Sequence, residues 1–358
     1  MTGDKVDNRL VTIYDIAREA GVSPATVSRV LTNNANVRKE KKEKVQYLID
    51  KYDFKPNAMA RGLSDTRSKI IGIIAADVRN PYYADVFVAC EMAASEAGYT
   101  VLLCNSLGDT DREERQMEML QEQRVDVVIQ LGGRADDLVT NREYIDLVNK
   151  LTKTIPIVVS GKLDDTDCYQ VQIDAKMAID LLIEHLIQLG HKKIALVDGN
   201  PIVLSTHQKY ERYQQLLQKY GIEYHPEYIV SGSYNSESGY QGMYRLLQLP
   251  EVPTAVIAIN DFSAAGIMRC ISDHGYRIPE DISVVSHDNT YMTDLLNPKL
   301  TSIDYDYKTF GRKLVETAIA AVEGQELPKL QKIIPTLVIR ESSGPVGNHM
   351  IKGETKIK

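Results

Sequence analysis

Apolar side chains recur near the start of the chain at the spacing of a short amphipathic helix. Four of them stand at positions i, i+3, i+4 and i+7 and therefore share one helical face. These four are Ile13, Ile16, Ala17 and Ala20. Thr12 precedes them where a helix N-cap belongs, and Gly21 follows them where a left-handed residue ends a helix. The pattern predicts a helix over residues 13–20 and a sharp turn after it.

A second and a third helix are predicted after this turn. Ser23 is expected to cap the second helix, and Pro24 takes its first position, where a missing N–H costs nothing. The apolar residues that pack it on the first helix are Val22, Val27, Val30 and Leu31. The third helix is expected over residues 38–53, with an apolar face of Val45, Leu48, Ile49 and Tyr52. Such an arrangement is either a DNA-reading helix-turn-helix or an ordinary helical hairpin.

From residue 70 onward, short apolar runs alternate with helical segments. The runs predict strands at residues 70–75, 100–104, 125–130, 155–159, 170–173, 194–197, 228–230, 255–259, 283–285 and 332–339. The intervening helices are expected near residues 84–97, 112–123, 144–151, 176–189, 207–220, 236–247, 262–274 and 310–322. Continuous apolar runs in this setting are typical of strands that helices bury on both faces. The sequence therefore predicts an α/β core of two doubly wound parallel sheets behind a small all-α headpiece.

Composition and length are those of a globular protein with more than one domain. The chain has 358 residues, of which 43% are hydrophobic and 25% charged, so it can bury a large core. No apolar run approaches the roughly 20 residues that span a bilayer, so we expect no membrane partner. The polar start lacks a secretory signal, and the four Cys lack metal-ligand spacing. We therefore expect a cytoplasmic protein with reduced thiols.

The net charge of −7 argues against nucleic acid, but its distribution reverses that argument. Residues 1–63 contain twelve Lys or Arg and eight Asp or Glu, a net charge of +4, whereas residues 64–358 carry −11. The candidates for contact with phosphates are Arg18, Arg29, Arg38, Lys39, Lys41, Lys42, Lys44 and Lys55. For residues 38–44, a solvated helix face is the alternative.

Three spaced motifs resemble the headpiece and hinge of the lactose-repressor (LacI/GalR) family. They are Thr-Ile-x-Asp-Ile-Ala from Thr12, Gly-Val-Ser-x-x-Thr-Val-Ser-Arg-Val-Leu from Gly21 and Pro-Asn-x-x-Ala-Arg-x-Leu from Pro56. The resemblance implies a headpiece at 10–56, a hinge helix and linker at 57–69, a two-lobed core at 70–340 that is similar to periplasmic binding proteins, and a polar tail at 341–358. The first lobe is expected at about 70–163 and 301–328, and the second at about 164–300 and 329–340.

By this resemblance, the second helix enters the major groove of a pseudo-palindromic double-stranded DNA operator. Pro24 and Ala25 would give apolar readout, and Arg29 would fork onto a guanine. Leu63 would wedge into the minor groove, and Ala60 would lie where two hinge helices meet. The DNA-binding residues that the resemblance implies are Thr12, Tyr14, Ser23, Pro24, Ala25, Thr26, Ser28, Arg29, Asn33, Asn57, Ala60, Arg61 and Leu63.

The core is expected to hold a small effector, similar to a sugar, between its lobes. Ligands of open α/β folds bind beyond the carboxyl ends of the strands, here at residues 77–83, 198–207, 260–261 and 286–289. The effector-binding residues that the resemblance implies are Tyr82, Tyr83, Asp174, Lys209, Tyr234, Asn260 and Asp288. For Asp174 and Asp261, capping of a helix is an equal alternative to effector contact. For Lys209, the alternative is a solvated position on a helix. Many relatives have Arg where this chain has Lys209. A Lys ammonium cannot form the paired hydrogen bonds of the planar Arg guanidinium, so a different ligand is expected.

The resemblance thus implies a homodimeric repressor of carbohydrate-utilisation genes whose operator affinity the effector sets. No catalytic motif follows a strand, and His185 and His191 lack metal-ligand spacing, so neither an enzyme, a cofactor nor a metal is expected. Two alternatives stay open. One is a stand-alone sugar-binding receptor, and the other is a repressor that a protein partner controls.

Overall fold

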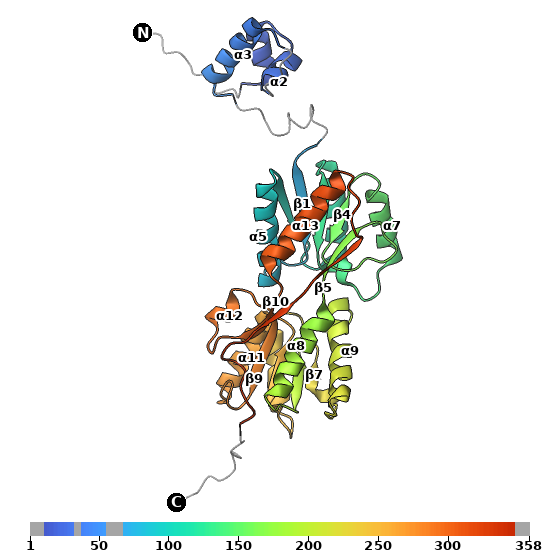
Figure 1. The fold of residues 1–358 in the computed structure, drawn as a ribbon, viewed down its shortest axis with the longest axis vertical. Coiled ribbons are helices and arrows are strands. Elements are labelled where there is room, and N and C mark those ends of the chain that lie inside the picture. The colour runs from blue at the N-terminus through green and yellow to red at the C-terminus, as the bar shows by residue number, and fades with distance from the viewer. Residues whose placement is uncertain (1–10, 32–36, 55–66, 348–358) are drawn as a thin grey trace, which may run out of the picture. The chain divides into compact units, whose positions relative to one another are not determined.

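The computed structural model describes residues 11–31, 37–54 and 67–347, which belong to two units that divide between Ser68 and Lys69. The described residues of the first unit form the helices α1 (Ile13–Ala20), α2 (Pro24–Leu31) and α3 (Lys39–Lys51) (Figure 1). Thr12 and Asp15 form a capping box at the start of α1, and Gly21 ends it at φ 68°. The predicted bounds of α1 are therefore confirmed.

The three helices bury one small apolar core. Its members are Ile16, Ala17, Ala20, Val27, Val30, Val45, Leu48 and Ile49. The prediction that Tyr52 belongs to this core is wrong, because its ring is 37% exposed. Its hydroxyl instead donates a hydrogen bond to Glu19 Oε2 at 2.8 Å, while Lys51 Nζ lies 2.9 Å from Glu19 Oε1. These contacts tie the end of α3 to α1.

The second unit contains two six-stranded sheets. The first has the order β11-β5-β4-β3-β1-β2. Its strands are β1 (Ile70–Ala75), β2 (Thr100–Asn105), β3 (Val127–Leu131), β4 (Ile157–Val159), β5 (Tyr169–Ile173) and β11 (Leu330–Ile333). The helices over it are α5 (Pro81–Glu96) and α13 (Tyr307–Val322) on one face, and α6 (Thr110–Glu122) and α7 (Arg142–Leu151) on the other. A 3-10 turn, η1 (Gly133–Asp136), follows β3.

The second sheet has the order β12-β10-β9-β8-β6-β7. Its strands are β6 (Ile194–Val197), β7 (Ile229–Val230), β8 (Ala255–Ala258), β9 (Ser283–Asp288), β10 (Thr301–Asp304) and β12 (Thr336–Val338). Helices α8 (Ala175–Gln188) and α9 (Leu204–Lys219) cover one face, and α10 (Ser236–Leu247) and α11 (Asp261–Asp273) cover the other. The short elements η2 (Pro226–Tyr228) and α12 (Met292–Leu295) complete this lobe. All strand pairs are parallel except β10 with β12, so the predicted fold class is confirmed.

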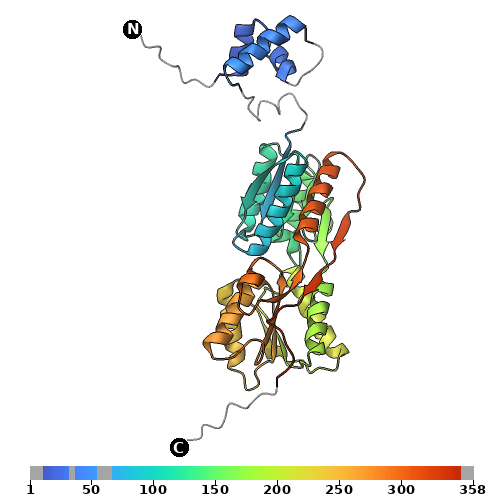
Figure 2. The same ribbon diagram turned by 60° about the vertical axis from the view of Figure 1, so that its left-hand side comes forward.

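The chain passes between the lobes three times, and these crossings correct the expected lobe boundaries. It crosses between β5 and α8, between β10 and α13, and between β11 and β12 (Figures 1 and 2). Strand β5 lies in the first sheet although the boundary at 164 assigned it to the second lobe. Strand β10, which was not predicted, lies in the second sheet although the boundary at 301 assigned it to the first lobe. The strand predicted at 332–339 is two strands that break at Ile334-Pro335 and belong to different sheets.

The segment after β12 is not the loose tail that was expected from residue 341. Ser342 is fully buried, its hydroxyl donates to the Val284 carbonyl at 2.6 Å, and the Val284 amide donates to the Ser342 carbonyl at 2.8 Å. His191 Nε2 lies 3.0 Å from the Gly344 carbonyl oxygen. Residues 341–347 therefore extend the packing of the second lobe through partners that are far away in sequence.

Candidate functional site

The headpiece exposes a polar and basic face on α1 and α2. Tyr14 is 68% exposed and stands one turn before the exposed Arg18, which pairs with Asp15 at 2.7 Å. On α2, Ala25 and Arg29 are both exposed and stand four residues apart, so they share one helical face. The structure therefore places the expected reading positions on the outward side of the second helix.

Other predicted DNA-contacting residues also have structural roles in the helix caps. The Thr12 hydroxyl donates to Asp15 Oδ2 at 2.6 Å. The Ser23 hydroxyl accepts from the Thr26 amide at 3.3 Å and lies 3.0 Å from Thr26 Oγ1. Pro24, Thr26 and Ser28 are half-buried. The candidates Asn33, Lys55, Asn57, Ala60, Arg61 and Leu63 lie outside the residues that the structure describes.

The second unit contains a cavity of about 830 Å³ between its two lobes. Segments after β1, β3 and β4 line it from the first lobe, and segments after β6, β7, β8 and β9 line it from the second. These are the carboxyl ends of parallel strands, where open α/β sheets bind ligands. The volume lies in the upper part of the range of roughly 300–1,000 Å³ that is usual for small-molecule sites.

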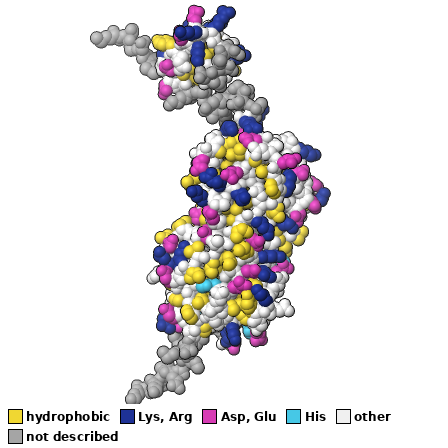
Figure 3. All heavy atoms as spheres, in the orientation of Figure 1, with side chains coloured by type: hydrophobic (Ala, Val, Ile, Leu, Met, Phe, Trp, Pro, Cys, Tyr) yellow, Lys and Arg dark blue, Asp and Glu magenta, His cyan; other side chains and the backbone are white. Residues whose placement is uncertain are grey.

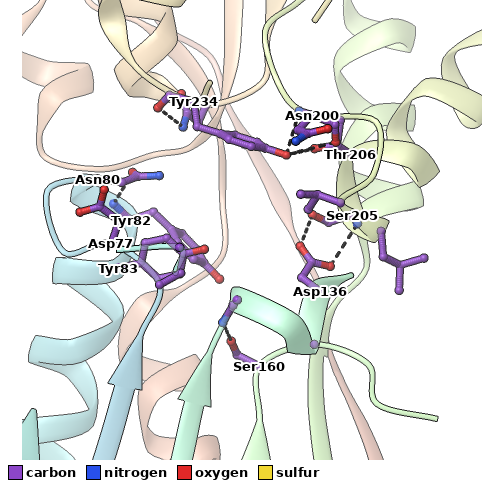
Figure 4. A pocket seen from close by; sticks show the side chains of 18 of the residues that line it. Asp77, Asn80, Tyr82, Tyr83, Asp136, Ser160, Asn200, Ser205, Thr206 and Tyr234 are labelled. Atoms are coloured by element: carbon purple, nitrogen blue, oxygen red, sulfur yellow. Dashed lines mark hydrogen bonds between the residues drawn. The ribbon is translucent and has the colours of Figure 1, made fainter. Parts of the chain in front are cut away.

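Six of the seven predicted effector-binding residues line this cavity. They are Tyr82, Tyr83, Lys209, Tyr234, Asn260 and Asp288. Figure 4 shows the three Tyr side chains. Asn80 caps α5 by accepting from the Tyr82 amide at 3.1 Å, which places both Tyr rings on the first turn of the helix. A Cβ at Gly132, where φ is 69°, would collide with the Tyr83 hydroxyl. A glycine at this position therefore lets the Tyr83 ring lie against the backbone after β3.

The cavity holds a ring cluster and a positioned hydroxyl. Tyr82 packs against Tyr83, Tyr305 and Tyr307 with centroid distances of 5.0, 6.2 and 6.1 Å. On the opposite wall, the Tyr234 hydroxyl accepts from the Asn200 amide at 3.0 Å and lies 2.7 Å from Thr206 Oγ1 (Figure 4). Burial raises the pKa of Tyr234 to about 12, so this hydroxyl stays protonated at neutral pH.

A buried lysine in the cavity is subject to the charges of two carboxylates. Lys209 is only 8% exposed, so the solvated position that was its alternative is excluded. Burial lowers the pKa of Lys209, and the charges of Asp288 and Asp136 oppose that shift. Burial also raises the pKa of Asp288, whose backbone adopts a φ of 103°. Strained backbone of this kind is concentrated at functional sites.

Sequence reasoning missed Asp136, which joins the two lobes. Asp136 ends η1 in the first lobe, and Ser205 lies in the first turn of α9 in the second. Asp136 Oδ1 accepts from the Ser205 amide at 3.1 Å, and Oδ2 accepts from the Ser205 hydroxyl at 2.5 Å (Figure 4). Burial raises the pKa of Asp136 to about 6. The sequence could have indicated Asp136, because this residue follows the carboxyl end of a predicted strand, where ligands of such folds bind.

Asp174 and Asp261 do not contact the cavity. Asp174 accepts from the Met177 amide at 3.1 Å and lies 3.0 Å from Lys332 Nζ, so it is a helix cap, and it is not among the residues that line the cavity. Asp261 is 1% exposed and holds four donors, while Asn260 caps α11 instead. These donors are the hydroxyls of Ser286, Ser302 and Thr290 and the Thr290 amide.

Glu113 is a second cavity residue that sequence reasoning missed. Its side chain is buried, its Oε2 accepts from the Arg134 amide at 3.4 Å, and its Oε1 has no hydrogen-bond partner. Burial raises its pKa to about 7, mainly because the charged form loses its hydration. The native state therefore binds this proton more tightly than the unfolded chain does.

This raised pKa predicts a pH-dependent effect of replacing Glu113 by Gln. Because the pKa of Glu113 is raised in the folded state, its contribution to the free energy of unfolding is largest at low pH. That contribution, at most about 3 kcal/mol, is lost as pH rises from about 4.5 to about 7. We expect the Tm difference, Glu113→Gln minus wild type, to grow between pH 5 and pH 8 in thermal unfolding. The control is Glu118→Gln, at an exposed position of the same helix. Parallel profiles for Glu113→Gln and wild type would contradict the assignment.

The described residues show neither a metal centre nor a membrane span. No group of three or more His, Cys, Asp or Glu among them could hold a metal ion. In the same part of the chain, no helix is both long and apolar enough to cross a membrane. Basic and acidic side chains are interspersed on the face of the lobes in Figure 3, so this face presents no extended basic surface.

Comparisons with known proteins agree with both parts of the chain. Residues 12–57 match the family model of bacterial regulatory proteins, lacI family, and residues 183–343 match a periplasmic binding protein-like domain. The HTH-type transcriptional repressor PurR of Mannheimia succiniciproducens is 32% identical and covers 93% of this chain and 98% of its own. Catabolite control protein A of Priestia megaterium is 33% identical, over 82% of this chain and 87% of its own.

A solved structure extends this agreement to the whole fold. It is that of the lac repressor dimer bound to operator and the anti-inducer ONPF, with 27% identity and a TM-score of 0.83, and it covers 94% of this chain and 100% of its own. The helix-turn-helix, the two-lobed core and these likenesses together show that the chain belongs to the lacI family of bacterial regulatory proteins and is a DNA-binding transcriptional repressor.

Proposed function

We propose that the repressor binds a pseudo-palindromic operator as a homodimer, and that a small sugar-like effector in the cavity between its lobes sets operator affinity. The observation that carries this proposal is the cavity itself, which residues of both lobes line. A ligand that contacts both lobes favours one arrangement of them over another. Such differential binding is what coupling to a distant DNA-binding unit requires.

The chemistry of the cavity favours a ligand that carries hydroxyl groups. Tyr82, Tyr83 and Tyr234 offer ring faces for C–H contacts. Asp136 and Asp288 supply carboxylate oxygens from the first and the second lobe. Genes of carbohydrate utilisation are accordingly the targets that we propose for this repressor.

The test is operator binding by the purified protein, measured by fluorescence anisotropy at a stated salt concentration. DNA containing palindromes with a central CG step is the probe, and neutral mono- and disaccharides are added one at a time. One saccharide that changes operator affinity supports the proposal. Operator binding that no saccharide alters would favour control by a protein partner. Sugar binding without sequence-specific DNA binding would favour a stand-alone sugar receptor.

The exposed position of Arg29 on α2 leads to a specific prediction. If its guanidinium forks onto a guanine, Arg29→Ala should cost about 1–3 kcal/mol at one base pair of each half-site. Binding to a library of single-base operator variants should then lose discrimination at that position only. Lys44→Ala, on the exposed side of α3, is the control, because loss of a phosphate contact weakens all sequences alike. An unchanged base profile for Arg29→Ala would refute the assignment.

We extend the proposal to the hinge, whose candidate residues lie outside the described part of the chain. Asn57, Arg61 and Leu63 would contact the minor groove, with Leu63 as the apolar wedge, and Ala60 would lie at the contact of two hinge segments. Effector binding would change the angle between the lobes and thereby favour or disfavour this pairing. The direction of that change decides between inducer and corepressor.

The homodimer is supported by an apolar surface on the first lobe, which we call the α5–β2 face. It consists of Val88 and Met92 on α5 and Leu103 on β2, each between 37% and 57% exposed. The expectation that β2 is buried on both faces is wrong, because β2 is the edge strand of its sheet. Contiguous exposed apolar surface of this kind marks interaction sites. A second copy of the chain is the partner that two-fold operator symmetry requires.

A further inference from the structure

Carboxylates already act on the cations that line the cavity. Three of the four Lys or Arg side chains among its described lining residues are in ion pairs. The fourth, Lys209, is buried, and the charges of Asp136 and Asp288 act on it. The three pairs are Arg79 with Asp77 at 2.6 Å, Arg134 with Glu114 at 2.7 Å and Lys162 with Asp164 at 2.6 Å. The lining includes five carboxylates and four cations, so it has no excess of positive charge.

The helix N-terminus beside Lys209 is occupied by the carboxylate of Asp136. Helix α9 begins at Leu204, and a free N-terminus of a helix this long attracts anions through its amides and dipole. Asp136 takes this position by accepting from both the amide and the hydroxyl of Ser205. An anionic ligand at this place would have to displace Asp136 or lie beside its negative charge.

Three other helices that begin at the cavity are capped by neutral side chains. Asn80, Asn235 and Asn260 line the cavity and accept backbone hydrogen bonds at the starts of α5, α10 and α11. The acceptor–amide distances are 3.1, 2.9 and 2.8 Å in the same order. The chain's own side chains therefore fill these anion-binding positions as well.

We infer that the cavity admits an uncharged, hydroxyl-bearing ligand and rejects phosphorylated or carboxylated ones, with Asp136 as the specificity-determining residue. Hydroxyl groups can donate to the carboxylates of Asp136 and Asp288. An anion would instead be buried beside the carboxylates of Asp136 and Asp288, whose charges already act on Lys209, and this burial is costly. This inference rests on the proposed function of the cavity as the effector site.

The first arm of the test uses inorganic phosphate, so it does not depend on knowing the effector. Binding to the full-length protein is measured by isothermal titration calorimetry at pH 7.5 for wild type, Asp136→Asn and Asp136→Ala. We expect no measurable binding to wild type and a gain in both variants. Asp136→Ala should bind phosphate more tightly than Asp136→Asn by about tenfold, because it also vacates the α9 N-terminus.

Asp137→Asn is the matched control. Asp137 lines the same cavity and its replacement changes the charge by the same amount, but it is not a partner of Ser205. We expect it to gain less phosphate affinity than Asp136→Asn. Circular dichroism of each variant checks that the lobes remain folded. Phosphate binding to wild type, or equal gains for Asp136→Ala and Asp137→Asn, would overturn the inference.

The second arm separates this inference from the proposed function. Wild-type protein is titrated with the matched pairs glucose and glucose 6-phosphate, and trehalose and trehalose 6-phosphate. Preference for a phosphorylated member overturns the charge selection but leaves the effector site in place. Failure of every neutral saccharide to change operator affinity overturns the sugar-effector proposal, whereas the phosphate results for the Asp136 variants still stand.

Discussion

Replacing Met92 and Leu103 by Asp will leave the repressor monomeric and will weaken operator binding by on the order of a hundredfold or more. Both side chains belong to the α5–β2 face, where they are 57% and 37% exposed. Two carboxylates at the centre of an apolar contact would be buried without partners, so the association of two copies is lost. A monomer engages one half-site and forfeits the gain from binding both.

Sedimentation velocity gives the oligomeric state, and fluorescence anisotropy with a full palindrome and a half-site gives the affinities. The variant should lose affinity for the palindrome but keep its affinity for the half-site. Val139→Asp serves as the control, because Val139 is 81% exposed and lies between η1 and α7, outside the α5–β2 face. A dimeric double variant with undiminished palindrome binding would remove the α5–β2 face from consideration as the interface.

Replacing Asp261 by Ala is expected to destabilise the second unit by about 3–5 kcal/mol. Asp261 is fully buried, and its Oδ2 accepts from the Thr290 amide at 2.7 Å and from the Thr290 hydroxyl at 3.0 Å. Its Oδ1 accepts from the Ser302 hydroxyl at 2.8 Å and from that of Ser286. The Ala variant leaves these buried donors without an acceptor and opens a cavity. The affected segment carries Asp288, so effector affinity should fall as well.

Urea unfolding at pH 7.5 measures this loss of stability. Asp261→Asn keeps one carbonyl oxygen and should lose less stability than Asp261→Ala. Asp273→Ala, on the partly exposed end of the same helix, should change stability by less than about 0.5 kcal/mol. Equal midpoints for Asp261→Ala and Asp273→Ala would show that the buried network contributes nothing to stability.

The local features of the fold could be predicted because their partners are near neighbours in sequence. The capping box of α1 joins residues three apart, and Gly21 needs only its own left-handed conformation. The strands β1 and β6 have the bounds that their apolar runs predicted. Tyr82 and Tyr83 were placed at the cavity because they follow the first predicted strand and the resemblance implies them as effector contacts. Each of these inferences uses information that a short stretch of chain contains.

The arrangement between the lobes was decided by contacts that are distant in sequence. Apolar runs look alike in both sheets, so periodicity could not assign β5, β10 and β11 to their lobes. Asp136 meets Ser205 across 69 residues, and the partners of Asp261 lie 25–41 residues away. Lys209 is buried because both lobes close around it. The pattern of its own helix, which is amphipathic and polar, does not predict this burial.

The sequence by itself therefore determined the helix-turn-helix, the alternation of strands and helices, and six of the residues that line the cavity. Only the tertiary structure decided which side chains join the lobes, which carboxyls have raised pKa values and which charges remain available to a ligand. The physical reason is that hydrophobic periodicity records burial along one element. The cost of burying a charge, by contrast, depends on every group that the fold brings near it.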